Sequence, residues 1–213
     1  FLASTNLSAF AHRAFGLNLP RYVWVIVSGV LAAGFARALN PDIEAAAVQQ
    51  RLTEANVEEL IRDHDLVLDG SDNFATRLTV SDAATRLQIP LVSAAAVQFQ
   101  GQVGLFRGWE ADKPCYRCFV GDAFDADDCD TCAEAGILGA LSATVGSFGA
   151  LITIRALAGI GEEVAGSLFL FDGLELDWRR IRLPKDRACR ACNPPRHGEG
   201  DHAEHGGGGG VRG

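Results

Sequence analysis

The stretch Asp65-Leu-Val-Leu-Asp-Gly-Ser-Asp-Asn73 decides the fold class. Its first half is a short apolar run that ends in turn residues, which is typical of a buried parallel strand. Residues 73–87 then show the pattern of a helix, and residues 90–94 (PLVSA) that of the next strand. A strand–helix–strand order predicts an α/β fold with a doubly wound sheet.

The segments on either side extend this sheet. Upstream, residues 42–50 are expected to form a strand, and Asn56 to begin a helix that runs to about Arg62, with acidic residues in its first turn. Downstream, residues 102–106 read as a further strand. Residues 167–171 and 178–183 alternate in the way that paired antiparallel strands do, which predicts an antiparallel extension of the sheet.

Two further segments of the chain are long and strongly apolar. Residues 22–36 (YVWVIVSGVLAAGFA) are short for a membrane span, which favours a buried helix or a strand followed by a helix over membrane insertion. A long helix is expected over residues 133–160, and residues 137–154 within it carry no charge. Its glycines and serines form small faces that let another backbone approach closely. We expect this helix to be buried between the sheet and a second subunit of a homodimer, without a membrane contact.

Composition limits the classes of function. The chain has 213 residues, of which 48% are hydrophobic, and this is globular composition rather than that of a disordered chain. The formal net charge of −8 argues against a nucleic-acid partner, since no basic run could neutralise phosphates. The cysteines form closely spaced pairs without a signal peptide, which favours a metal in a reducing cytosol over disulfides. We therefore expect a cytoplasmic protein.

All cysteines of the chain lie in Cys-x-x-Cys pairs. Two thiolates at this spacing can sit on one tight turn and bind one face of a tetrahedral ion, and two such turns complete a closed four-sulfur zinc site. The chain offers three turns, so one pair is surplus to a single site. Disulfides or a redox pair are the alternatives. The pairs are Cys115/Cys118, Cys129/Cys132 and Cys189/Cys192.

The turn at residues 69–77 (DGSDNFATR) follows a predicted strand, at the place where open α/β sheets bind ligands. Asp72 would stand at a helix N-terminus, where a carboxylate can hold Mg²⁺ and backbone N–H groups can meet phosphate oxygens. An ordinary turn, in which Asp72 caps the helix, accounts for the same residues. The residues alone leave both interpretations open.

The ordered set of motifs resembles the ThiF/MoeB/HesA family, the prokaryotic relatives of ubiquitin-activating enzymes that include molybdopterin-synthase adenylyltransferase. The resemblance runs from about Ala38 to Cys192 and implies a Rossmann-like fold. It leaves residues 1–37 as an atypical N-terminal segment and residues 193–213 as a Gly/His-rich tail that we expect to be disordered. The matching segments are residues 69–77, 91–95 (LVSAA), 101–103 (GQV), 114–118 (PCYRC), 131–136 (TCAEAG), 171–173 (FDG) and 189–192 (CRAC).

For activity, the resemblance implies Mg-ATP-dependent adenylylation of the C-terminal glycine of a ubiquitin-like sulfur-carrier protein ending in Gly-Gly, in molybdopterin or thiamine biosynthesis. Asp72 would coordinate Mg²⁺, while Asn73 and, as a weaker candidate, Arg77 would contact the nucleotide. Cys132 would act in catalysis through a thioester or an acyl disulfide with the carrier. The family's structural zinc ligands match Cys115, Cys118, Cys189 and Cys192.

Part of the family's pattern is missing from residues 1–37. The Gly-rich loop of the form GxGGxG, the ribose-binding acid, the SNLxRQ segment and a lysine are not found there, and the chain starts at Phe1 without any methionine. A fragment, a frameshift ahead of residue 38 or a degenerate paralogue would account for this, and we expect impaired adenylylation. The alternatives are a non-catalytic, zinc-stabilised module that binds a sulfur-carrier protein and an oxidoreductase that uses Cys129 and Cys132.

Overall fold

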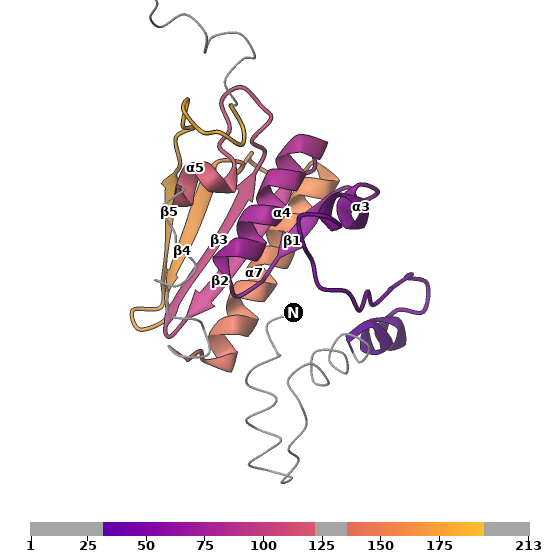
Figure 1. Cartoon of the computed structure of the whole chain (residues 1–213). Helices are drawn as coiled ribbons and strands as arrows, with labels where there is room; N and C mark the ends of the chain where they lie inside the picture. The colour runs from indigo at the N-terminus through magenta and orange to yellow at the C-terminus, as the bar shows by residue number, and fades with distance from the viewer. Residues whose placement is uncertain (1–31, 122–135, 194–213) are drawn as a thin grey trace, which may run out of the picture.

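The computed structural model describes residues 32–121 and 136–193 of the chain. Its centre is a mixed five-stranded sheet in the order β1-β2-β3-β4-β5 (Figure 1). β1 and β2 are parallel, and each later pair of neighbours is antiparallel. The predicted α/β class and the antiparallel extension are therefore confirmed. The strands are Val67–Asp69, Leu91–Val97, Gln100–Phe106, Ser167–Asp172 and Asp177–Arg182.

Helix α4 (Phe74–Leu87) connects the two parallel strands. Asn73 is its N-cap, and the side-chain Oδ1 of Asn73 accepts the backbone N–H of Thr76 at 2.8 Å. Gln88 ends the helix in the left-handed conformation, with φ 58°. This strand–helix–strand unit lies where the sequence predicts it, and it brings the carboxyl ends of β1 and β2 to the same edge of the sheet.

Helices cover both faces of the sheet. Successive residues of β2 point to opposite sides. Leu91 accordingly belongs to a buried cluster with α4 and α3 (Val57–Ile61), whereas Val92 belongs to a second cluster with α7 (Gly139–Ala158). Figure 1 shows α4 and α7 on opposite sides of the strands. Burial on both faces explains why β2 is apolar without a polar alternation.

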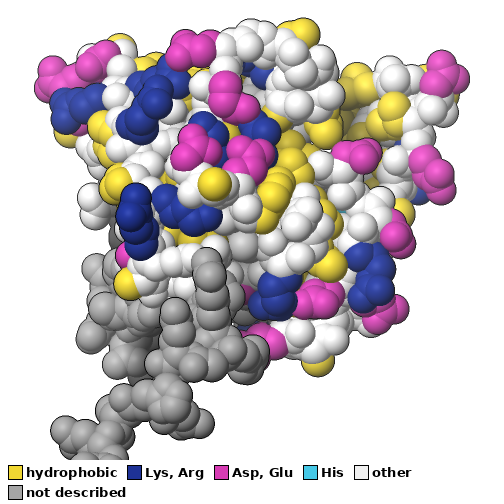
Figure 2. Space-filling model, turned by 90° about the horizontal axis from the view of Figure 1, so that it is seen from above, with side chains coloured by type: hydrophobic (Ala, Val, Ile, Leu, Met, Phe, Trp, Pro, Cys, Tyr) yellow, Lys and Arg dark blue, Asp and Glu magenta, His cyan; other side chains and the backbone are white. Residues whose placement is uncertain are grey.

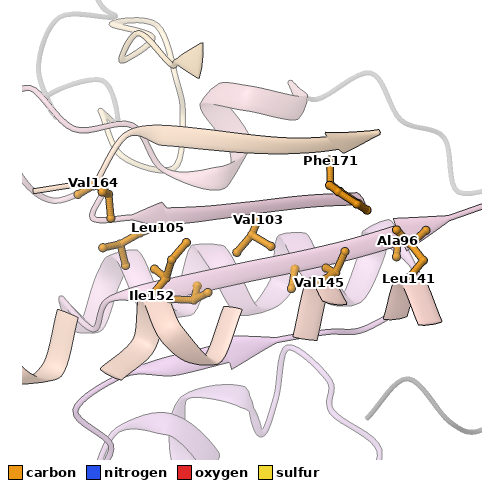
Figure 3. Packing of buried hydrophobic residues seen from close by; sticks show 11 residues of the cluster. Ala96, Val103, Leu105, Leu141, Val145, Ile152, Val164 and Phe171 are labelled. Atoms are coloured by element: carbon orange, nitrogen blue, oxygen red, sulfur yellow. The ribbon is translucent and has the colours of Figure 1, made fainter. Parts of the chain in front are cut away.

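The second cluster lies between α7 and strands β2 and β3. Figure 3 shows Val145 and Ile152 of α7 facing Val103 and Leu105 of β3. The helix can approach the sheet closely because Gly101 of β3 has no side chain: a Cβ at Gly101 would lie 2.4 Å from Cγ2 of Val145. A single glycine thus sets the distance between the helix and the sheet.

The expectations for residues 32–50 need correction, whereas residues 22–31 of the apolar segment lie outside the described residues. Residues 42–50 form no strand and are mostly exposed. This alanine- and glutamine-rich segment has low β-propensity and pairs with no strand of the described sheet. Residues 32–39 are helical but not buried, since Phe35 is 67% and Leu39 72% exposed. The predicted N-cap Asn56 does precede α3, but its side chain accepts the N–H of Thr53 instead of capping the helix.

The long helix begins later than predicted. It starts at Gly139, because Ile137 forms a β-bridge to Gln98 and Gly136 has a φ of 76°. Its end at Ala158, followed by the left-handed Gly159, agrees with the prediction. By length and composition α7 could cross a membrane, and 22% of it is buried in the fold. One face packs on the sheet, as predicted.

The opposite face of α7 is exposed. Leu151, Ile154 and Leu157 are 51%, 59% and 56% exposed, and they follow one another at spacings of three residues. Gly146, on the same side of the helix, has no atom within 4 Å of the position of a Cβ. The described residues therefore leave an apolar helix face without a covering element.

Candidate functional site

A pocket of about 350 Å³ opens at the carboxyl ends of β1 and β2. This is where open α/β sheets bind ligands. The start of α4 forms one wall, and strands β2, β3 and β4 form the other. The structure thus brings the candidates Asp72, Asn73 and Arg77 into one pocket. The lining residues are Asp72, Asn73, Phe74, Arg77, Ala95, Ala96, Val97, Gln100, Gly101, Gln102, Tyr116 and Leu170.

Asp72 and Asn73 have different structural roles. Asn73 caps α4 through its Oδ1, so that Asp72 is not needed as a cap. Asp72 is exposed at the pocket, where a carboxylate oxygen is a suitable ligand for Mg²⁺. The side-chain nitrogen of Asn73 remains a hydrogen-bond donor toward the pocket. The chemistry of this wall therefore fits a divalent cation together with a polar group of a ligand.

Arg77 forms the floor between β1 and β2. Its guanidinium is buried and donates to Oγ of Ser93 at 2.8 Å and to the carbonyl of Ala94 at 2.9 Å. It also donates to the carbonyl of Ser71, and it lies 3.6 Å from Oδ2 of Asp69. These bonds point into the protein, so Arg77 holds together the two strand ends on which the pocket is built.

Three buried polar atoms near Arg77 have no hydrogen-bond partner within the described part of the chain: Oδ2 of Asp69, Oγ of Ser71 and the hydroxyl of Tyr116. Burial raises the pKa of Tyr116 above its ordinary value, and the positive charge of Arg77 opposes this rise. The phenol is therefore neutral at neutral pH. No sequence pattern singles out Tyr116 except its place between two cysteines.

The four cysteines of the first and third pairs meet in space. The Sγ–Sγ distances are 3.6 Å for Cys115 to Cys189, 3.8 Å for Cys115 to Cys118 and 3.4 Å for Cys118 to Cys192. All four sulfur atoms lie within 4.8 Å of one another. A regular tetrahedron with zinc–sulfur bonds of about 2.3 Å requires sulfur atoms about 3.8 Å apart. The donor set and its spacing therefore fit a closed tetrahedral metal site.

The electrostatics of this cluster also suit a cation. Hydrogen bonding with Cys115 lowers the pKa of Cys118 to about 5, whereas burial raises the pKa of Cys192 to about 12. The pKa of Cys115 is raised as well, by its hydrogen bond with Cys118 and by burial, so a thiolate at Cys118 lies beside the thiols of Cys115 and Cys192. A metal ion would replace those protons and neutralise the charge.

An ion pair fixes the first cysteine turn to the rest of the fold. Arg117, on α5 (Tyr116–Val120), donates from Nε to Oδ1 of Asp82 at 3.2 Å and from Nη2 to Oδ2 at 2.6 Å. Asp82 belongs to α4, so this bidentate contact ties the cysteine cluster to the helix that also begins at the pocket. Figure 2, a view from above, shows acidic and basic side chains interspersed over this end of the molecule.

The candidate Cys132 and its neighbour Cys129 lie outside the described residues, because the described part of the chain stops at residue 121 and resumes at residue 136. Their suggested chemistry therefore stays a prediction from the sequence.

Comparison with known proteins identifies the family. The sequence profile of the ThiF family matches residues 30–191. The chain is 42% identical over 159 residues to a sulfur carrier protein adenylyltransferase of Thermus thermophilus, covering 73% of this chain and 59% of the relative. It is 39% identical over 155 residues to the sulfur carrier protein ThiS adenylyltransferase of Escherichia coli, covering 72% of this chain and 60% of the relative. The α/β chain with a pocket beside Asp72 thus belongs to the ThiF family.

Other relatives are longer proteins. The chain is 41% identical over 162 residues to the adenylyltransferase and sulfurtransferase MOCS3 of Bos taurus, covering 76% of this chain and 35% of the relative. The chain therefore spans between 35% and 60% of the length of these three relatives. Among solved structures, E. coli MccB has the same fold, with a TM-score of 0.65 at 14% identity over 83% of this chain and 53% of MccB.

Proposed function

We propose that this chain carries the part of an ATP-dependent adenylyltransferase that binds the reacting groups. The enzyme would transfer AMP to the C-terminal glycine of a ubiquitin-like sulfur-carrier protein. The observation that carries this proposal is the pocket at the ends of β1 and β2, which is lined by an exposed carboxylate, Asp72, and by the amide side chain of Asn73. Two relatives are sulfur carrier protein adenylyltransferases and a third is an adenylyltransferase and sulfurtransferase, which supports the choice of reaction. We propose that this reaction serves thiamine or molybdenum-cofactor biosynthesis.

The residues of the pocket would act mainly by position and charge. Mg-ATP, when bound, supplies the AMP group: a carboxylate oxygen of the carrier bonds to the α-phosphorus, and pyrophosphate leaves. Asp72 would hold the metal ion, and Asn73 would donate from its side-chain nitrogen to the nucleotide. Arg77 would keep the strand ends in place through its bonds to Ser93 and Ala94. In a later step the thiol of Cys132 would attack the acyl-adenylate of the carrier, forming a thioester and releasing AMP. An acyl disulfide would form with the same release of AMP if Cys132 had first received a sulfur atom from a persulfide donor.

The sheet wall of the pocket suits the end of such a carrier. Ala95, whose side chain lies on the opposite face of β2 from the α7 cluster, is small, so a narrow peptide end can lie against this strand. A Gly-Gly terminus is the narrowest peptide end available. We therefore expect the carrier to enter along β2 and β3.

The cysteine cluster is proposed to bind structural Zn²⁺. All four ligand positions would be filled by sulfur from Cys115, Cys118, Cys189 and Cys192, which leaves no position for a reacting water. The ion would join the turn after β3 to the segment after β5. We assign it a role in stability and none in the transfer of AMP.

The protein is further proposed to be a cytoplasmic homodimer that uses the exposed face of α7. Leu151, Ile154 and Leu157 would pack on a second copy, and Gly146 would allow the close approach of its backbone. A second copy of the same face is the occupant that best matches an uncharged, self-complementary helix surface.

ATP–pyrophosphate exchange with the purified carrier tests the proposed reaction. Wild-type chain should catalyse exchange above background only with carrier and Mg²⁺, and Asp72→Asn should lower the rate by about a hundredfold or more. Asp112→Asn, which removes a carboxylate that is 78% exposed and does not line the pocket, is the matched control and should keep the wild-type rate. No exchange with the wild-type chain would contradict the proposal.

The second candidate is a non-catalytic module that binds the carrier. The sequence of residues 1–37 favours it, because no GxGGxG loop is found there to cradle phosphates and impaired catalysis is therefore expected. Carrier binding without ATP, measured by calorimetry, together with no exchange would select this candidate.

A further inference from the structure

We infer that Tyr116 contacts the molecule bound in the pocket and donates its hydroxyl proton to an anionic oxygen of that molecule. The inference deepens the proposed function and rests on it for the identity of the ligand. It adds a residue outside the Asp72–Arg77 segment to the binding machinery. Its chemical target is a phosphoryl or a carboxylate oxygen, since the proposed reaction brings one of each into this pocket.

The ring of Tyr116 is held in one orientation. The residue is 2% exposed, and its ring meets those of Phe106 and Phe119 edge-on, with centroids 5.5 Å and 6.0 Å away. It is the first residue of α5, directly after Cys115, and it lines the pocket together with Arg77. The cysteine cluster, the aromatic contacts and the pocket thus fix the position of one hydroxyl group.

That hydroxyl has no hydrogen-bond partner within the described residues. A buried hydroxyl without a partner destabilises a protein relative to an apolar group of the same shape, so phenylalanine would satisfy the packing better. The neighbouring Arg77 cannot accept the proton, because a guanidinium only donates. Asp69 does not accept it in this arrangement: its Oδ1 takes the N–H of Ser71 at 2.9 Å, and its Oδ2, 3.6 Å from Nη1 of Arg77, has no hydrogen-bond partner among the described residues. An acceptor oxygen of a bound ligand would give the Tyr116 hydroxyl the hydrogen-bond partner that it lacks among the described residues.

Ser81 provides a matched control. Its hydroxyl is also buried and without a partner among the described atoms, and it sits on α4, but Ser81 does not line the pocket. Removing either hydroxyl should leave the fold at least as stable as before, because neither has a hydrogen-bond partner among the described residues. The two variants therefore compare a residue that lines the pocket with one that does not.

The experiment compares wild type, Tyr116→Phe and Ser81→Ala by titration calorimetry with two separate ligands, Mg-ATP and a short peptide that ends in Gly-Gly. Tyr116→Phe should weaken the binding of one of them by about tenfold or more, the effect of losing a hydrogen bond to a charged oxygen. A loss confined to Mg-ATP assigns the contact to a phosphoryl oxygen, and a loss confined to the peptide assigns it to the carboxylate. Ser81→Ala should bind both ligands as wild type does, and neither variant should have a lower melting temperature.

If Tyr116→Phe binds both ligands with the affinity of the wild type, the inference is overturned, and the hydroxyl is assigned to a hydrogen bond with a buried water alone. An equal loss in Ser81→Ala, or no binding of either ligand by the wild-type chain, would overturn it too. Pyrophosphate exchange separates this result from the proposed function. If ligand binding depends on Tyr116 but the wild-type chain catalyses no exchange, the proposed reaction is rejected and the Tyr116 contact is kept. If the wild-type chain catalyses exchange and Tyr116→Phe leaves its rate unchanged, the reaction is kept and the contact is rejected.

Discussion

The Sγ atoms of Cys118 and Cys192 lie 3.4 Å apart, although Cys118 belongs to the helix after β3 and Cys192 to the segment after β5. The two strands in between, β4 and β5, extend the sheet on its antiparallel side. A metal ion in this cluster would therefore close a large loop around that half of the sheet. Closing such a loop restricts the unfolded chain more than the folded one.

The first prediction concerns this metal. The purified chain should contain one zinc ion, and Cys189→Ser should lose it and lower the free energy of unfolding by about 4 kcal/mol or more, because a structural metal contributes directly to folding. Cys129→Ser, which removes a cysteine of the surplus pair, should keep the ion and the stability. Metal analysis and urea unfolding measure both quantities. Full zinc content in Cys189→Ser would refute the assignment.

The second prediction concerns the pH dependence of metal binding. At neutral pH Cys192, with a pKa of about 12, holds its proton in the metal-free chain, and zinc must displace it. Zinc affinity should therefore rise with pH, and each bound ion should release protons. Competition with a chromophoric chelator at several pH values measures the trend. Affinity that does not change with pH would contradict the thiol ligand set.

The third prediction concerns the contact between Arg117 and Asp82. The side chain of Arg117 is 8% exposed, so Arg117→Met leaves a mostly shielded carboxylate without its partner and should cost about 3 kcal/mol of stability. Arg86→Met breaks the pair with Glu58, whose side chains are 55% and 40% exposed, and should cost less than about 1 kcal/mol. Chemical denaturation compares the two variants. Equal losses would show that burial does not decide the strength of these pairs.

The fourth prediction concerns two glycines around α7. Gly101→Ala places a Cβ 2.4 Å from Val145 and should destabilise the fold by about 2 kcal/mol, because the helix and the sheet must move apart. Gly139→Ala adds a methyl group to an open part of the helix and should stabilise it by up to about 1 kcal/mol. Thermal unfolding distinguishes the two. A stable Gly101→Ala variant would mean that α7 packs less closely than described.

The fifth prediction concerns the proposed dimer. Ile154→Glu should give a monomer, because a charge on the apolar face of α7 would be buried in the interface. Leu174→Glu changes a residue with similar exposure, 66% against 59% for Ile154, in the turn between β4 and β5, and should leave the dimer intact. Light scattering after gel filtration gives the mass of each. A monomeric wild-type chain would contradict the proposed homodimer.

The residues around β1 show how much of the fold can be predicted from the sequence. A short apolar run, a turn rich in small polar residues and a helix-forming segment are local signals, and they place β1, α4 and β2 correctly. The spacing of the cysteines predicts a four-sulfur cluster without showing which of the three pairs is surplus. The family resemblance selects the first and third pairs, and the structure brings their sulfur atoms together.

Long-range packing decides the rest. Residues 42–50 could not be excluded as a strand without knowing that no partner lies beside them. The start of α7 depends on a bridge between Ile137 and Gln98, which are far apart in the chain. Tyr116 enters the pocket only because α5 packs against α4. None of these contacts has a local signal in the sequence.

The mass of the carrier protein tests the central proposal most directly. Carrier incubated with Mg-ATP and the wild-type chain should gain the mass of one AMP at its C-terminus, as seen by mass spectrometry of the intact protein. The same incubation with Asp72→Asn should leave the carrier unchanged. An unmodified carrier with the wild-type chain, or equal modification with Asp72→Asn, would contradict the assignment of this pocket to the adenylylation reaction.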